Sequence, residues 1–99
     1  MARGGYVYIV TNKRYGVVYT GVTSNLAARI TQHREGKGGD FTSRYKLTRL
    51  VYFERHDTIE EAIAREKAIK AWKRTWKIEA IEKVNPSWDD LYATLHLEG

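Results

Sequence analysis

The sequence predicts a small α+β fold in which helices flank a three-stranded antiparallel sheet. Short runs of β-branched and aromatic residues, typical of strands, alternate with longer segments that have helical periodicity. The 99 residues are 42% hydrophobic and 12% aromatic, which suffices for one hydrophobic core. No repeat, low-complexity tract or linker interrupts them, so we expect residues 1–99 to form a single domain.

The first two strands are expected to pair as a β-hairpin. Tyr6–Thr11 and Val17–Val22 contain the strand-forming residues, and Asn12 and Gly16 between them favour a turn. A third strand is predicted over the segment KLTRLVYFE, Lys46–Glu54. These three segments supply the whole predicted sheet.

Two amphipathic helices are predicted, one on each side of the third strand. The first covers Leu26–Arg34, because the preceding TSN offers N-cap residues and the following EGKGGD favours a flexible loop. The second begins at the capping-box spacing of Thr58 and Glu61 and reaches Trp72.

A third helix is predicted over Trp76–Val84. Asn85-Pro86 ends it, since proline lacks an N–H and disfavours helical backbone in the residue before it. Ser87 would then cap a short final helix in SWDDLY. The predicted order is therefore β-β-α-β-α-α.

Composition limits the classes of function. The absence of cysteine excludes disulfides, a thiolate nucleophile and cysteine-ligated metal centres. No long apolar run or charged-then-apolar leader is present, so we expect a soluble, cytoplasmic protein without a membrane partner. The net charge of +5 favours a polyanionic partner such as a nucleic acid.

Charged residues interrupt the apolar faces of both amphipathic helices. In the first, Arg29 and His33 share the face that contains Leu26 and Ile30. In the second, a carboxylate turned toward the core is costly unless it is paired or binds a metal ion. That carboxylate belongs to Glu66, which lies within the stripe Ile59, Ala62, Ile63 and Ile69.

The predicted hairpin adds hydroxyl groups to this set. Tyr6 and Tyr8 share one face of their strand, and Tyr19 and Gly21 share one face of the next. A glycine within a strand marks a bulge or the close approach of another group.

Each of these residues also has a purely structural interpretation. The tyrosines can be half-buried packing residues, Arg29 and Glu66 can form an ion pair, and His33 can cap a helix C-terminus at the surface. Their convergence favours chemistry, because together they suit hydrolysis of a phosphodiester. Tyrosine and histidine can move protons, arginine can bind phosphate oxygens, and one glutamate can hold a hydrated Mg²⁺. The set predicts a one-metal nuclease.

The order of these residues resembles the GIY-YIG endonuclease superfamily. Its two hairpin motifs are similar to YVY at Tyr6–Tyr8 and YTG at Tyr19–Gly21, with ten residues between them. The similarity spans nearly the whole chain and is greatest to small stand-alone bacterial members related to the nuclease domain of excinuclease ABC. The arginine, histidine and glutamate of the family match Arg29, His33 and Glu66.

The resemblance implies divalent-metal-dependent cleavage of DNA and a role for each matched residue. Either Tyr8 or Tyr19 would be the general base, and we favour Tyr8, assisted by His33, with Tyr19 orienting water or phosphate. Arg29 would hold the scissile phosphate, and Glu66 would bind one Mg²⁺ or Mn²⁺ ion.

The sequence departs from the family motifs at two positions and leaves a third unmatched. Tyr6 replaces the glycine of the first motif, and Thr20 replaces the isoleucine of the second. Asn85 is a candidate by order for a late family asparagine, but it also suits the helix stop before Pro86.

We expect binding to DNA that is weak and tolerant of sequence, because phosphate contacts position a protein without specifying bases. Trp72 and Trp76 could stack on bases, although their spacing favours core packing. A partner protein that directs the chain to its target is compatible with this. The candidate phosphate contacts are Arg34, Lys37, Arg44, Lys46, Lys70, Lys73 and Arg74.

Three functions are compatible with these residues. The first is a metal-dependent DNA endonuclease acting in repair or recombination. The alternative is a non-catalytic nucleic-acid-binding module whose nuclease site is vestigial or depends on a partner. A protein-interaction scaffold is the third, and it leaves Glu66 and Arg29 explained only as an ion pair.

Overall fold

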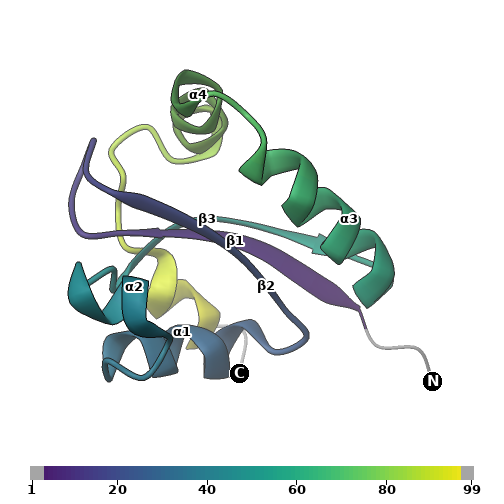
Figure 1. The fold of residues 1–99 in the computed structure, drawn as a ribbon, viewed down its shortest axis with the longest axis horizontal. Coiled ribbons are helices and arrows are strands. Elements are labelled where there is room, and N and C mark those ends of the chain that lie inside the picture. The colour runs from purple at the N-terminus through teal and green to yellow at the C-terminus, as the bar shows by residue number, and fades with distance from the viewer. Residues whose placement is uncertain (1–3, 97–99) are drawn as a thin grey trace.

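A three-stranded antiparallel sheet separates two helical layers (Figure 1). The computed structural model describes residues 4–96. Helices α3 (Ile59–Lys70) and α4 (Arg74–Val84) cover one face of the sheet. The other face is covered by α1 (Leu26–Arg34), the short helix α2 (Asp40–Arg44) and the 3₁₀ helix η1 (Leu91–His96). The predicted α+β class and its three-stranded sheet are confirmed.

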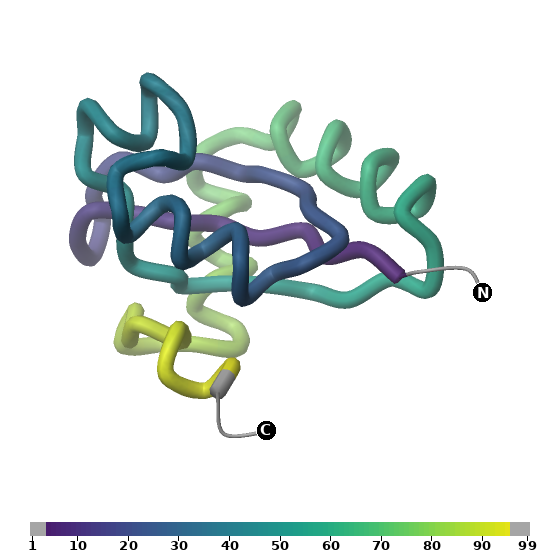
Figure 2. Tube along the Cα trace, turned by 90° about the horizontal axis from the view of Figure 1, so that it is seen from below, coloured from purple at the N-terminus to yellow at the C-terminus, as the bar shows by residue number. Residues whose placement is uncertain are grey.

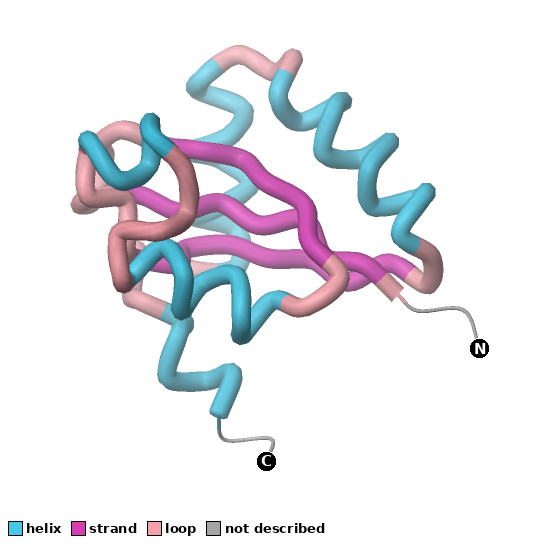
Figure 3. The backbone as a smooth tube through the Cα atoms, turned by 60° about the horizontal axis from the view of Figure 1, so that its bottom comes forward, coloured by secondary structure: helices cyan, strands magenta, loops and turns pink. Residues whose placement is uncertain are grey.

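The strands are β1 (Gly5–Thr11), β2 (Val18–Thr23) and β3 (Arg49–His56), in the spatial order β2-β1-β3. The first strand is therefore central, as the strands in Figure 3 show. In the predicted hairpin, Tyr8 pairs with Gly21, and Val10 pairs with Tyr19. Because paired residues point to the same face, this register places both phenols on the α1 side of the sheet.

Alternation along β1 divides the interior into two apolar clusters. Val7 and Ile9 point toward α3 and α4, and Tyr8 and Val10 point toward α1. The first cluster includes Val51, Ile69, Ile81 and Trp88. The second includes Leu26, Ile30, Leu47 and Leu50.

The helix starts follow the predicted caps. Helix α1 has the predicted bounds, and the side chain of Asn25 accepts a hydrogen bond from the backbone N–H of Ala28 at 3.1 Å. Helix α3 begins after Thr58, whose hydroxyl accepts from the N–H of Glu61 at 3.1 Å, so the predicted capping box is present. Helix α4 begins two residues before the predicted start.

Three predictions about the segments between these elements are wrong. The segment after α1 is not a loop throughout, because α2 begins at Asp40, directly after Gly39 with its positive φ of 132°. The third strand begins three residues late, since Lys46 has a φ of 54° that is incompatible with a strand. Ser87 does not cap the last helix; the carboxylate of Asp90 does, accepting from the N–H of Tyr92.

Two expectations about buried apolar residues also need correction. Trp72 packs against the core as predicted, but Trp76 is 51% exposed, because it points outward from the start of α4. Ile63 is likewise exposed, so the buried stripe of α3 consists of Ala62, Glu66 and Ile69. No helix within residues 4–96 has the length and apolar character needed to cross a membrane.

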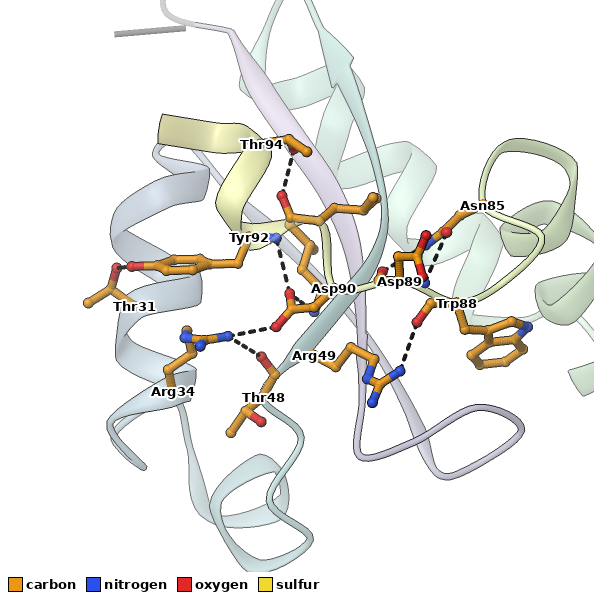
Figure 4. Close-up of polar contacts among 12 residues, drawn as sticks. Thr31, Arg34, Thr48, Arg49, Asn85, Trp88, Asp89, Asp90, Tyr92 and Thr94 are labelled. Atoms are coloured by element: carbon orange, nitrogen blue, oxygen red, sulfur yellow. Dashed lines mark hydrogen bonds and ion pairs between the residues drawn. The ribbon is translucent and has the colours of Figure 1, made fainter. Parts of the chain in front are cut away.

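A cluster of side-chain hydrogen bonds, here called the C-terminal anchor, ties residues 85–96 to α1 and β3 (Figure 4). The buried amide of Asn85 donates to the carbonyls of Val51 and Asp89 at 3.0 and 2.9 Å, and its oxygen accepts from the N–H of Asp89. Asp90 accepts from the N–H of Leu50 at 3.2 Å and pairs with Arg34 at 2.7 Å. The polar groups of Asn85 and Asp90 are thus each matched by partners.

Candidate active site

The candidate site lies at the edge of the sheet formed by β2, between the two helical layers (Figure 2). The ring and hydroxyl of Tyr8 on β1 pass directly over Gly21 on β2. A Cβ at Gly21 would overlap the Tyr8 ring, so the glycine is required by this close approach. The predicted role of Gly21 as a structural motif residue has this physical basis.

The hydroxyl of Tyr8 joins two residues of α1. It lies 2.9 Å from Nε2 of His33 and accepts a hydrogen bond from Nε of Arg29 at 3.3 Å. We call these three residues the phenol cluster. Tyr8 is only 1% exposed, and burial raises the pKa of its phenol, whereas the hydrogen bond and charge of Arg29 oppose that rise.

His33 is buried and neutral. The residue is 2% exposed, and burial together with the charge of Arg29 lowers its pKa to about 4. The interpretation of His33 as a protonated surface cap is therefore wrong. Its ring also lies 6.1 Å from that of Tyr19, measured between centroids.

The second ring nitrogen of His33, Nδ1, has no hydrogen-bond partner among the described residues. It faces Gly38, where a Cβ would overlap the imidazole. If the ring proton is on Nδ1, Tyr8 can donate to Nε2 and only Nδ1 is left unsatisfied. If it is on Nε2, both the Tyr8 proton and Nδ1 lack partners. Counting hydrogen bonds therefore assigns the proton to Nδ1.

Arg29 is half-buried and makes two further hydrogen bonds. Its terminal nitrogens donate to Oε1 of Gln32 at 3.0 Å and to the carbonyl of Gly38 at 2.9 Å. The guanidinium is thereby held beside Tyr8. The alternative of an ion pair between Arg29 and Glu66 is wrong, because the Glu66 carboxylate pairs with Lys70 instead.

Glu66 approaches the same edge from the opposite helical layer. It is 8% exposed, and its carboxylate lies 2.7 Å from Nζ of Lys70, one turn later on α3. The ammonium of Lys70 lies 5.5 Å from the ring centroid of Tyr19. Glu66 is also near enough for its charge to raise the pKa of Tyr8. Tyr19 and Lys70 thus lie between Glu66 and the phenol cluster.

The donor set fits one hydrated cation. Within residues 4–96, no three His, Cys, Asp or Glu side chains come together as a potential metal cluster. A single carboxylate suits Mg²⁺, which keeps most of its water ligands and is completed by substrate phosphate. It does not suit a dehydrated zinc centre, which requires three or four protein ligands.

The predicted phosphate contacts differ in their availability. Arg34 is held by Asp90 and lies over the ring of Tyr92, and Arg74 donates to the carbonyls of Tyr15 and Gly16. Lys70 is engaged by Glu66. The others are exposed without a salt bridge in the described part of the chain: Lys37, Arg44, Lys46 and Lys73.

Two features of the site could not be identified from the sequence. Gly38 both accepts from Arg29 and makes room for His33, yet it stood in a segment interpreted as a flexible loop. Phe41 and Tyr45 of α2 continue an aromatic contact that begins at Tyr19. Asn85, an uncertain candidate by order, belongs to the C-terminal anchor.

Comparison with known proteins places this geometry in a family. The family described as the GIY-YIG catalytic domain matches residues 4–79. The chain belongs to the GIY-YIG family. A catalytic domain of this family implies action on nucleic acid, and GIY-YIG nucleases typically use a divalent metal ion.

Relatives of this GIY-YIG chain are UPF0213 proteins. One from Staphylococcus haemolyticus is 42% identical over 78 residues, which is 79% of this chain and 94% of that protein. One from Staphylococcus saprophyticus is 38% identical over the same shares of both chains. The solution NMR structure of a UPF0213 protein from Bacillus halodurans is 28% identical, with a TM-score of 0.52, covering 88% of this chain and 92% of that one.

Proposed function

We propose that this chain is a metal-dependent endonuclease that hydrolyses phosphodiester bonds in DNA. The observation that supports this most strongly is the contact of Arg29, Tyr8 and His33 at the edge that Glu66 approaches from the other layer. In a GIY-YIG catalytic domain, this arrangement combines proton transfer, phosphate binding and a carboxylate in one place.

Tyr8 serves as the general base and His33 as its relay. A water molecule attacks phosphorus and gives a proton to the Tyr8 oxygen, while the Tyr8 proton moves to Nε2 of neutral His33. The bond from phosphorus to the leaving oxygen breaks, and that oxygen takes a proton from solvent. The negative charge of a bound phosphate stabilises the imidazolium that forms.

Arg29 and Tyr19 position the phosphate. The terminal nitrogen of Arg29 that now donates to Gln32 can donate to a phosphate oxygen while Nε stays on Tyr8. Tyr19 stands between the phenol cluster and Lys70, so its hydroxyl can orient the attacking water or the phosphate.

Glu66 would hold the single cation, Mg²⁺ or Mn²⁺, which when bound supplies positive charge beside the phosphate. The ammonium of Lys70 then becomes available for a phosphate oxygen, because its carboxylate partner is engaged. The expected relation to the nuclease domain of excinuclease ABC, and a role in repair or recombination, remain predictions.

Cleavage assays on plasmid, branched and single-stranded DNA test this proposal. With Mg²⁺ or Mn²⁺ we expect cleavage by the wild type and a loss of at least about 100-fold in Glu66→Ala and Arg29→Ala, since each removes transition-state stabilisation. Glu60→Ala and Arg55→Ala, which change exposed residues of the same types, are matched controls. Undiminished cleavage by the two site variants would identify a contaminating nuclease.

One observation favours the alternative of a binding module without catalysis. Lys70 already neutralises Glu66, so a metal ion must displace or share that partner. DNA binding that depends on salt, with no metal-dependent cleavage of any tested substrate, would support the module and exclude the nuclease.

A further inference from the structure

Helix α2 extends the candidate site with an exposed row of aromatic rings. The ring of Tyr19 lies 6.3 Å from that of Phe41, and Phe41 lies 4.9 Å from Tyr45, measured between centroids. Phe41 is 47% exposed and Tyr45 is 44% exposed. We call Phe41 and Tyr45 the aromatic platform.

Packing of α2 does not account for these exposed rings. The residue that α2 buries is Thr42, and the backbone N–H of Leu47 donates to its carbonyl at 2.9 Å, which holds the helix on the domain. Phe41 and Tyr45 are four residues apart, so they share the helix face that projects from this attachment. Large aromatic rings left half in water in this way are typical of binding surfaces.

The charge around the platform complements a nucleic acid. Residues 36–48 contain three cations, Lys37, Arg44 and Lys46, and one carboxylate, Asp40. All three cations are exposed. A basic surface interleaved with aromatic rings matches the phosphates and the bases of a single strand, respectively.

The platform is also continuous with the phenol cluster. Tyr19 contacts Phe41 on one side and approaches His33 on the other, with ring centroids 6.1 Å apart. A nucleotide bound at Arg29 would therefore have its neighbour within reach of α2. In the view of Figure 2, α2 lies beside the end of the β2 edge, next to α1.

A second exposed aromatic pair carries a weaker case. Trp72 and Trp76 form an edge contact at 6.5 Å, but Trp72 packs on the core and lies under the guanidinium of Arg65. The cavity beside the pair is also lined by Glu79, whose charge repels phosphate. The observations therefore favour α2.

We propose that Phe41 and Tyr45 stack on an unpaired base beside the phosphate bound at the candidate site, so that the preferred substrate is single-stranded or locally unpaired DNA. This inference rests on the proposed nuclease function for the position of the phosphate. A fully paired duplex keeps its bases stacked on one another and cannot offer one to the platform without unpairing.

Binding measurements without turnover test the proposal. In EDTA, and in a Glu66→Ala background, fluorescence anisotropy would compare a labelled single strand with the blunt duplex of the same sequence. We expect Phe41→Ala and Tyr45→Ala each to weaken single-strand binding about 10-fold, with little effect on the duplex. Phe41→Tyr and Tyr45→Phe should bind like the parent, because each keeps its ring. Trp76→Ala is the matched control for loss of an exposed aromatic.

A 2-aminopurine base placed along the single strand gives a second readout. Its fluorescence should be quenched at one position in the parent protein and restored in Phe41→Ala. Equal losses in Phe41→Ala and Trp76→Ala, or unchanged affinity in both platform variants, would overturn the proposal even if the wild type cleaves DNA. Loss of strand binding only in the platform variants, with no cleavage by the wild type, would support stacking and reject the nuclease.

Discussion

The C-terminal anchor and the phenol cluster both connect α1 to the sheet, the first through β3 and the second through β1. In the anchor, the donors and acceptors of Asn85 meet partners between 2.9 and 3.0 Å. In the phenol cluster, Nδ1 of His33 is buried without a partner among the described residues, and the phenol has an elevated pKa. Complete pairing is typical of a cluster that stabilises a fold, and incomplete pairing of one that performs chemistry.

Removing the phenol hydroxyl should have the largest effect. Tyr8→Phe is expected to lower turnover by about 10²–10⁴-fold, because it removes the group that takes the proton from water. Stability should change by about 1 kcal/mol at most, since the ring still fills its place. Single-turnover cleavage and urea unfolding measure the two quantities. A larger loss of turnover in Tyr19→Phe than in Tyr8→Phe would make Tyr19 the base.

The anchor should respond in the opposite way. Asn85→Ala removes three hydrogen bonds and leaves the buried carbonyl of Val51 unpaired, so we expect a loss of about 2–4 kcal/mol of unfolding free energy. Turnover per folded molecule should be unchanged. Normal stability with lost turnover would instead make Asn85 part of the site.

The pH dependence of stability separates the two clusters further. His33 has a pKa near 4 when folded and 6.5 in its reference state, so the unfolded chain takes up the proton first as the pH falls. The contribution of neutral His33 is complete above pH 6.5 and is lost as the pH falls toward 4, which amounts to about 2 kcal/mol between pH 7 and pH 5. Urea unfolding of the wild type and His33→Leu at both pH values measures it. An equal pH response in the two proteins would contradict a buried neutral imidazole.

The smallest effect is expected at the exposed rim of the anchor. Arg34→Gln breaks the ion pair with Asp90, in which both side chains are over a third exposed, and should cost about 0.5–1 kcal/mol. The cost should shrink in high salt. A clear loss of DNA affinity in this variant would show that Arg34 also contacts phosphate, as its position after His33 predicted.

The sequence predicted the parts of the molecule that local rules govern. Helix α1 has the predicted bounds because Asn25 provides a cap. Polar residues on apolar faces pointed to Arg29, His33 and Glu66, and the structure brings the first two into contact with Tyr8. Glu66 follows at the same edge, because α3 packs on β1 and β2.

The remaining features depend on contacts between segments distant in sequence. Nothing local indicates that Lys70, rather than Arg29, pairs with Glu66. Helix α2 has five residues and begins after a glycine with positive φ, which is too short for periodicity to show. The anchoring role of Asp90 likewise depends on Leu50 and Arg34, which only the fold brings near.

The central position of β1 has a consequence for how a substrate is accommodated. Tyr8 stands on a strand that is hydrogen-bonded on both sides, so its backbone is fixed by two neighbours at once. Adjustment to nucleic acids of different shape must then come from the long side chains of Arg29 and Lys70, each of which can exchange one partner for another. The chain thus combines a rigid reference point for the reacting atoms with compliant cations around it, which allows tolerance of substrate shape without a hinge.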